Sequence, residues 1–266
     1  MKRLLGTAAA VAALALVAGC GDNASDSASG SGSAAPSASS SGSVVTGTIT
    51  VFAAASLTES FGTVGKQFEA AHPGTTVKFN FGASSALAQS IIQGAPADVF
   101  ASASAKNMTQ IGDEATGSTT FANNVMEIAV PPDNPGKVTQ VSDLTKAGLK
   151  VALCQAQVPC GATAKQVFDK QKLTVKPVTE GADVKSVLTA VQLGEVDAGV
   201  VYKTDVQAAG AKVKGIEIPD AQNASTSYPI ASLKAAPNSA GAAAFVDYVL
   251  SADGEKVLAD AGFAGP

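Results

Sequence analysis

The stretch "VFAAASLTESFGTVGKQF" (residues 51–68) joins an apolar run typical of a buried strand to a segment of helical periodicity. Four apolar residues recur at helical spacing and form one stripe: Leu57, Phe61, Val64 and Phe68. Ser56 lies at the joint. The stretch "FNFGASSALAQSI" (79–91) repeats the pattern, with Ser84 at its joint. Both stretches predict a strand followed directly by a helix, with a hydroxyl at the corner.

Apolar runs of the same kind recur along the chain. They predict strands at 48–53, 76–81, 98–102, 126–131, 149–153, 197–202 and 228–233. Segments of helical period lie between most of them, and alternating strands and helices predict a mostly parallel sheet covered on both faces. The 220 residues from 47 to 266 are long enough for two α/β lobes. We expect residues 47–127 plus 227–266 in lobe I and 128–226 in lobe II.

The first 46 residues are expected to lie outside the folded part. Two basic residues precede an apolar run that ends in "VAGC" (17–20), which resembles the export signal and lipobox of bacterial lipoproteins. We therefore expect a signal peptide over 1–20 and a lipid on Cys20, anchoring the protein to the outer face of the cytoplasmic membrane. A secreted protein with an accidental cysteine is the alternative. Residues 21–46, almost all Ser, Gly, Ala and Asp, predict a disordered tether.

The composition excludes several kinds of partner. The chain has 18 basic and 22 acidic residues, a net charge of −4, which argues against binding nucleic acid. Arg3 is the only arginine, so the part after Cys20 has no guanidinium fork for a carboxylate or phosphate. The absence of tryptophan argues against an aromatic cage.

The two serine corners predict an anion site. Ligands of open α/β sheets bind beyond the carboxyl ends of the strands, where helices begin. A helix N-terminus presents unpaired N–H groups and partial positive charge, and Ser56 and Ser84 add hydroxyl donors there. Two alternatives stay open. Ser56 begins an S-x-x-E capping box with Glu59, in which it would serve only its own helix. Ser84 could be an ordinary N-cap or turn serine.

Several segments resemble the periplasmic molybdate-binding proteins of ABC importers, in the order of that family. They are "TITVFAAASLTESF", "FNFGASSALAQSIIQGAPADVFASA", "VPCGATAKQVF", "GADVKSVLTAVQLGEVDAGVVYKTDV" and "YPIASLKAAPNSAGAAAFVDYVLS". The resemblance covers about 47–266. It implies a two-lobed periplasmic-binding-protein-like fold, in which each lobe is a mostly parallel sheet flanked by helices and the ligand lies in the cleft between them. It further implies a monomeric receptor, not an enzyme and without a cofactor, that delivers molybdate or tungstate to an ABC permease.

The same resemblance implies a set of oxyanion ligands, all neutral donors. They are the hydroxyl and N–H of Ser56 and Ser84, the backbone N–H of Cys160 and Val184, and the phenol of Tyr202. Family members often carry a small residue such as alanine at the position of Cys160, a change that a backbone contact tolerates. Without the resemblance, Val184 is simply the first apolar residue after a helix cap, and Tyr202 a half-buried tyrosine with its hydroxyl in water. Because an ionised oxyanion only accepts hydrogen bonds, we expect donors and no aspartate facing the cleft.

Two cysteines, Cys154 and Cys160, bracket "QAQVP". Thiols outside the cytoplasm tend to pair, so we expect a disulfide, with two free thiols as the alternative. Two cysteines and one distant histidine, His72, cannot supply four zinc ligands.

Three other functions compete with a molybdate receptor. Sulfate or another tetrahedral oxyanion has the same acceptors, and composition does not separate these ions. A serine hydrolase needs a base beside its serine, but His72 lies at the far end of the helix that follows Ser56. An adhesin needs aromatic anchors, and only 5% of the residues are aromatic.

Overall fold

The computed structural model describes residues 45–266. The expected signal peptide (1–20), the expected lipid site Cys20 and most of the expected tether (21–46) lie outside these residues. Within the described part, no helix has both the length and the apolar character that crossing a bilayer requires.

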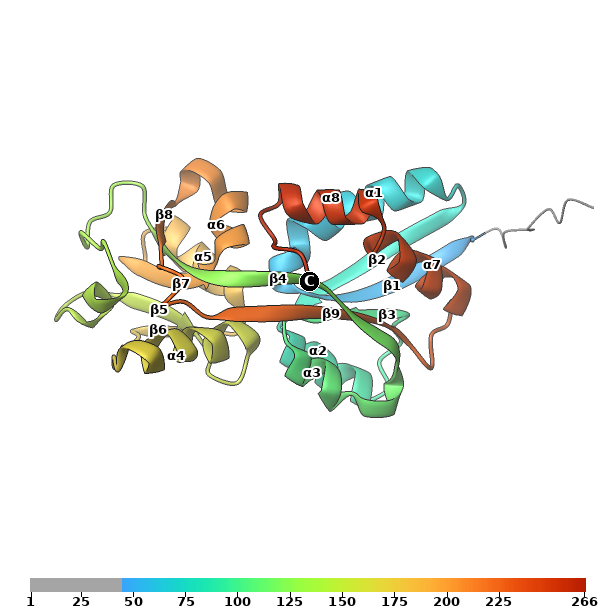
Figure 1. The fold of residues 1–266 in the computed structure, drawn as a ribbon, viewed down its shortest axis with the longest axis horizontal. Helices are drawn as coiled ribbons and strands as arrows, with labels where there is room; N and C mark the ends of the chain where they lie inside the picture. The colour runs from blue at the N-terminus through green and yellow to red at the C-terminus, as the bar shows by residue number, and fades with distance from the viewer. Residues whose placement is uncertain (1–44) are drawn as a thin grey trace, which may run out of the picture. The chain divides into compact units, whose positions relative to one another are not determined.

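Nine strands of the described residues form one continuous sheet (Figure 1). They are β1 (Gly47–Ala54), β2 (Thr75–Gly82), β3 (Val99–Ala101), β4 (Ala115–Val130), β5 (Val151–Cys154), β6 (Thr179–Gly181), β7 (Ala198–Tyr202), β8 (Lys214–Glu217) and β9 (Ser225–Leu233). The order is β2-β1-β3-β9-β4-β7-β5-β6, with β8 paired to β4. The pairings β1–β2, β1–β3, β5–β6 and β5–β7 are parallel, and the four that involve β4 or β9 are antiparallel. The sheet is therefore mixed rather than mostly parallel, because β4 and β9 run against their neighbours.

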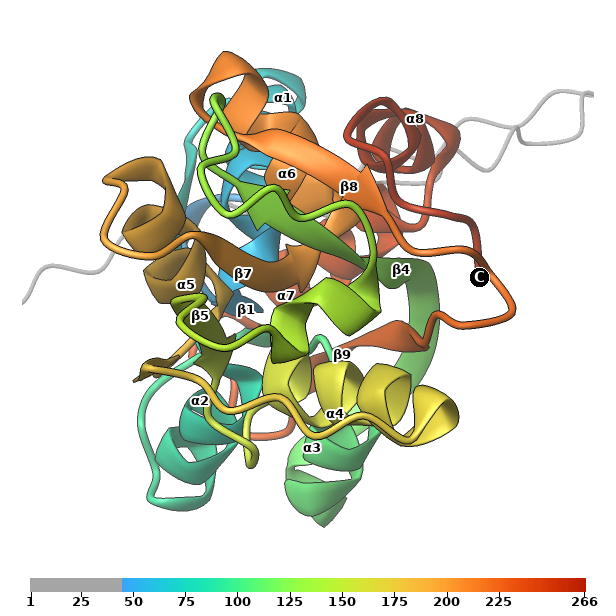
Figure 2. The same cartoon turned by 90° about the vertical axis from the view of Figure 1, so that its left-hand side faces the viewer.

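Helices cover both faces of this sheet. The α-helices are α1 (Thr58–Ala71), α2 (Ser84–Ile92), α3 (Ala105–Gln110), α4 (Pro159–Gln171), α5 (Val184–Gln192), α6 (Lys203–Ala209), α7 (Ser239–Val249) and α8 (Ala252–Asp260). Short 3₁₀ turns are η1 (Ala55–Leu57), η2 (Gly112–Glu114), η3 (Val141–Thr145) and η4 (Gly210–Lys212). In Figure 1, α1, α7 and α8 lie on one side of β1–β3 while α2 and α3 lie on the other. Figure 2 looks onto the end of the molecule that carries α4, α5 and α6.

The strands β4 and β9 link two lobes. β4 pairs with β9 as far as Val125 and with β7 and β8 from Met126 onward. Lobe I contains β1–β3, α1–α3, α7 and α8, with hydrophobic clusters on both sheet faces. Lobe II contains β5–β8 and α4–α6 around a cluster of its own. The two-lobed α/β fold expected from the sequence is thus confirmed.

The opening stretch forms the elements that its pattern predicts. Leu57, Phe61, Val64 and Phe68 are all fully buried. Phe61 and Phe68 pack against Phe245 of α7, with ring centroids 6.1 and 5.4 Å apart. Burying a side chain of this size stabilises the fold by roughly 1.5–3 kcal/mol. This stripe holds α1 on lobe I and thereby fixes the corner that carries Ser56.

Candidate functional site

All five residues of the expected oxyanion site line one cavity between the lobes. Ser56 and Ser84 come from lobe I, whereas Cys160, Val184 and Tyr202 come from lobe II. The volume of this cavity is ≈ 20 Å³. One water molecule needs about 10–15 Å³ by that measure, so the cavity suits a solute of a few atoms rather than a sugar or nucleotide.

Helix N-termini surround this cavity. Ser84 and Val184 are the first residues of α2 and α5, Cys160 is the second residue of α4, and Ser56 lies in η1. The first N–H groups of a helix have no acceptor within it, and the helix dipole adds partial positive charge at that end. Three α-helices therefore direct unpaired donors at one point, the arrangement that binds an anion without a cation.

Buried partners hold the two serine hydroxyls. The Oγ of Ser84 accepts a hydrogen bond from the N–H of Ala103 at 2.9 Å, which leaves its proton free to donate. The Oγ of Ser56 lies 2.8 Å from the hydroxyl of Tyr228 on β9. Neither serine caps a helix with its side chain. The capping alternatives for Ser56 and Ser84 are therefore wrong, and both hydroxyls remain free to serve the cavity.

Tyr202 supplies an unpaired donor. Its side chain is 1% exposed, so the alternative of a hydroxyl in water is wrong. Within residues 45–266 no partner lies within hydrogen-bond distance of this buried hydroxyl, although the side chains of Thr163 and Tyr228 lie near it. Burial raises the pKa of Tyr202 well above its ordinary value, so the phenol stays protonated. A buried polar group without a partner is costly, and a ligand that accepts hydrogen bonds would remove this cost.

The loop that carries Cys160 is tightly held. Cys154, the last residue of β5, and Cys160 form a disulfide with their Cα atoms 5.8 Å apart. A Cβ on the next residue, Gly161, would lie 2.1 Å from the carbonyl oxygen of Gln155. The close approach of α4 to this loop therefore requires glycine, and the disulfide and glycine together fix the N–H groups at the start of α4.

One carboxylate lines the cavity, against the expectation that the cleft would contain none. Asp183 is the N-cap of α5, and its Oδ1 accepts from the N–H and the hydroxyl of Ser186 at 2.9 and 3.2 Å. This part of the alternative view of Val184 is correct, because Val184 does follow a helix cap. The cap bonds direct the negative charge at its own helix, which limits its repulsion of an anion.

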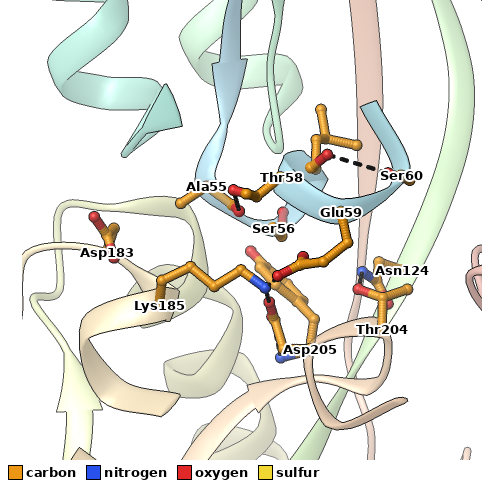
Figure 3. A network of polar contacts seen from close by, with 12 residues as sticks. Ala55, Ser56, Thr58, Glu59, Ser60, Asn124, Asp183, Lys185, Thr204 and Asp205 are labelled. Atoms are coloured by element: carbon orange, nitrogen blue, oxygen red, sulfur yellow. Dashed lines mark hydrogen bonds and ion pairs between the residues drawn. The ribbon is translucent and has the colours of Figure 1, made fainter. Parts of the chain in front are cut away.

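Charged side chains lie close behind the cavity. Lys185 of α5 reaches between Glu59 of α1 and Asp205 of α6 (Figure 3), with its Nζ 2.7 Å from Glu59 and 3.0 Å from Asp205. Burial raises the pKa of Asp205 to about 6, although Lys185 opposes this shift. No lysine is among the described residues that line the cavity. The nearby cation is thus already neutralised by two carboxylates, one from each lobe.

Sequence reasoning missed the residues that support the site. Tyr228 and Lys185 contact partners far away in the sequence, and so does Asn124 through its Nδ2. Asp205 is the exception, because it also accepts from the N–H of Tyr202, three residues earlier. The Ser56–Tyr228 contact joins residues 172 positions apart. Glu59 carried the S-x-x-E spacing, which predicted a helix cap rather than the ion pair with Lys185.

The fold and cavity define a class: a two-lobed solute-binding protein with a small, donor-lined site between its lobes. A family model described as "Bacterial extracellular solute-binding protein" matches residues 49–264. The chain therefore belongs to the bacterial extracellular solute-binding proteins, extracytoplasmic components of transport systems.

Relatives and solved structures place the chain more narrowly. It is 41% identical over 222 residues to the protein of Mycobacterium tuberculosis named molybdate-binding protein ModA, covering 82% of this chain and 85% of the relative. It is 35% identical over 267 residues to the Bacillus subtilis protein named putative ABC transporter substrate-binding lipoprotein YvgL, covering 96% and 95%. The solved substrate-binding domain of a putative molybdenum ABC transporter from Clostridium difficile aligns with a TM-score of 0.62 at 30% identity, over 83% of this chain and 100% of that one. These findings confirm the resemblance to the molybdate-binding proteins of ABC importers.

Proposed function

We propose that this protein binds molybdate, and tungstate as well, and delivers the oxyanion to an ABC permease. The ligands are the hydroxyls of Ser56, Ser84 and Tyr202 and the backbone N–H groups at the starts of η1, α2, α4 and α5. A lipid on Cys20 anchors the protein outside the cytoplasmic membrane, and it works as a monomer without a cofactor. The relatives named molybdate-binding ModA and substrate-binding lipoprotein YvgL support this assignment.

The observation that carries the proposal is the unpaired hydroxyl of Tyr202. It is buried, protonated and lines the same cavity as Ser56 and Ser84. Among the described residues no partner lies within hydrogen-bond distance of this donor, so a bound solute would satisfy it. Each hydrogen bond to a charged group contributes roughly 1.5–3 kcal/mol, so five such residues supply on the order of 10 kcal/mol. That is enough in principle for sub-micromolar affinity.

Neutral donors also separate candidate anions. Molybdate, tungstate and sulfate are dianions that only accept hydrogen bonds, whereas phosphate near neutral pH keeps a proton that needs an acceptor. Sulfate is the nearest rival, with the same charge and shorter bonds. The identity to ModA favours molybdate over sulfate.

The serines lack what a hydrolase needs. Ser56 contacts a tyrosine hydroxyl and Ser84 a backbone N–H, neither of which is a base. His72 lies at the C-terminal end of α1 with its ring 4.3 Å from that of Phe68. We therefore propose binding rather than catalysis as the role of both hydroxyls.

Calorimetric titration of the purified full chain tests this function. Molybdate and tungstate should bind with similar, sub-micromolar affinity, and phosphate should bind far more weakly. If sulfate binds with micromolar or tighter affinity and molybdate does not bind, the ligand is sulfate rather than molybdate. Labelling of Ser56 or Ser84 by a fluorophosphonate probe would instead indicate a hydrolase.

A further inference from the structure

A buried hydroxyl that does not line the cavity contacts one of its donors. Tyr228 of β9 is fully buried, and its Oη lies 2.8 Å from the Oγ of Ser56. Either oxygen could donate across this distance. The direction matters, because a Ser56 that donates to Tyr228 would have no proton left for an anion.

Asn124 of β4 favours one direction. Its Oδ1 accepts from the N–H of Val125 at 3.0 Å, which fixes the orientation of the amide. Its Nδ2 therefore faces the Oγ1 of Thr204 at 2.8 Å and the Oη of Tyr228 at 3.4 Å (Asn124 and Thr204 are seen together in Figure 3). An amide N–H can only donate, so the oxygen of Tyr228 accepts a hydrogen bond from Asn124.

The proton of Tyr228 is then available to Ser56. Within residues 45–266, the Oγ of Ser56 at 2.8 Å is the nearest partner of this hydroxyl, whereas the phenol of Tyr202 lies near it but beyond hydrogen-bond distance. Burial raises the pKa of Tyr228, so the phenol keeps its proton at any physiological pH. The three groups form a directed chain from Asn124 to Tyr228 to Ser56, and the proton of Ser56 turns to the cavity.

We propose that Tyr228 is a specificity-determining positioning residue, which makes Ser56 a donor and blocks it as an acceptor. The inference rests on the proposed function. A protonated oxyanion such as hydrogen phosphate needs one acceptor in the site, and the serine oxygens are the side-chain candidates in lobe I. At Ser84 the N–H of Ala103 occupies the oxygen, and at Ser56 the hydroxyl of Tyr228 does so. Lobe I thereby offers donors to fully ionised oxyanions and no free acceptor to hydrogen phosphate. The remaining side-chain carboxylate at the cavity is Asp183 of lobe II, which caps its own helix.

The test is the substitution Tyr228→Phe in the full chain, with Tyr248→Phe as a matched control. Tyr248 also lies in lobe I, but its hydroxyl bonds to Gln67 on an exposed surface. Affinities for molybdate and for phosphate are measured by calorimetry, the latter by competition. Loss of one neutral hydrogen bond should weaken molybdate binding by about 3- to 10-fold. The freed oxygen of Ser56 should strengthen phosphate binding, so that the ratio of the two affinities falls by about 10-fold or more.

The outcomes are distinct. An unchanged affinity ratio, with both anions weakened alike, would give Tyr228 a purely structural role and overturn the inference. Failure of the wild-type protein to bind molybdate would overturn the proposed function first, and this inference with it. Should Tyr228→Phe not fold, Asn124→Ala provides the second test, because it releases the lone pair of Tyr228 and should lower the same ratio. A ratio unchanged in Asn124→Ala would equally contradict the directed chain.

Discussion

The two lobes meet the same cavity with different chemistry. Lobe I offers two hydroxyls, those of Ser56 and Ser84, whose oxygens are already engaged by neutral partners. Lobe II offers backbone N–H groups at Cys160 and Val184 and the unpaired phenol of Tyr202, with the Lys185–Asp205 ion pair behind it. Lobe I is thus oriented before the solute arrives, whereas the phenol of lobe II gains its first hydrogen bond from the solute. Substitutions in the two lobes should therefore have different effects on anion affinity and on stability.

The largest effect is expected in lobe I. The double substitution Ser56→Ala and Ser84→Ala removes two hydrogen bonds to charge and should weaken molybdate binding by about 10²- to 10⁴-fold. Ser90→Ala on the same helix α2 is the control, since its hydroxyl bonds only to the exposed turn at Ala86. Calorimetry on the three proteins measures the difference. Equal affinities in all of them would remove both serines from the site.

In lobe II, Tyr202→Phe should separate binding from stability. Molybdate binding should weaken by roughly 10- to 100-fold, because one hydrogen bond to charge is lost. The melting temperature without ligand should stay the same or rise, since the substitution removes a buried hydroxyl that has no partner. A clear fall in the ligand-free melting temperature would mean that the phenol has a structural partner.

The buried carboxyl of Asp205 in lobe II should make the stability of the protein depend on pH. Folding raises the pKa of Asp205 from 3.8 to about 6, so the folded state binds its proton more tightly than the unfolded state. The contribution of Asp205 to the free energy of unfolding is therefore greatest below pH 4 and is lost as the pH rises through 6, by on the order of 2–3 kcal/mol. Urea unfolding from pH 4 to 7 measures it, and Asp205→Asn should flatten the profile. If Asp205→Asn shows the same pH profile of stability as the wild-type protein, another group causes the pH dependence.

The disulfide should affect stability more than binding. Reducing Cys154–Cys160 reopens a short loop and should lower the free energy of unfolding by about 2 kcal/mol. Reduction leaves the backbone N–H of Cys160 in place. Molybdate affinity should therefore fall by less than about 10-fold, which is less than the loss expected when one hydrogen bond to a charged ligand is removed. Urea unfolding and calorimetry with and without reductant test both parts. A loss of affinity as large as that of the double serine variant would mean that the loop collapses.

Elements that are defined by local sequence periodicity could be predicted, whereas strands that depend on pairing with distant residues could not. Strands with apolar runs, such as β1 and β2, and the buried stripe of α1 follow from local periodicity. The short polar strands β6 and β8 and the exposed first half of β4 do not, because pairing rather than side-chain pattern makes them strands. The lobe boundaries at 127/128 and 226/227 stay predictions.

The site divides in the same manner. Helix N-termini at Ser56 and Ser84 can be located from sequence, and the resemblance supplied Cys160, Val184 and Tyr202. The partners that orient Ser56 could not be found. Tyr228 contacts Ser56, and Asn124 contacts Tyr228, only because β4 and β9 pair side by side in the folded sheet. Asp183 was missed as a wall of the cavity because a helix cap and a site residue have the same local signature.

A crystal structure of the molybdate complex tests the central claim most directly. We expect the oxyanion oxygens to lie about 2.7–3.2 Å from five donors. These donors are the hydroxyls of Ser56, Ser84 and Tyr202 and the backbone N–H groups of Cys160 and Val184. Lys185 should remain paired with Glu59 and Asp205. A lysine or a metal ion in contact with the oxyanion, or molybdate bound outside this cavity, would contradict it.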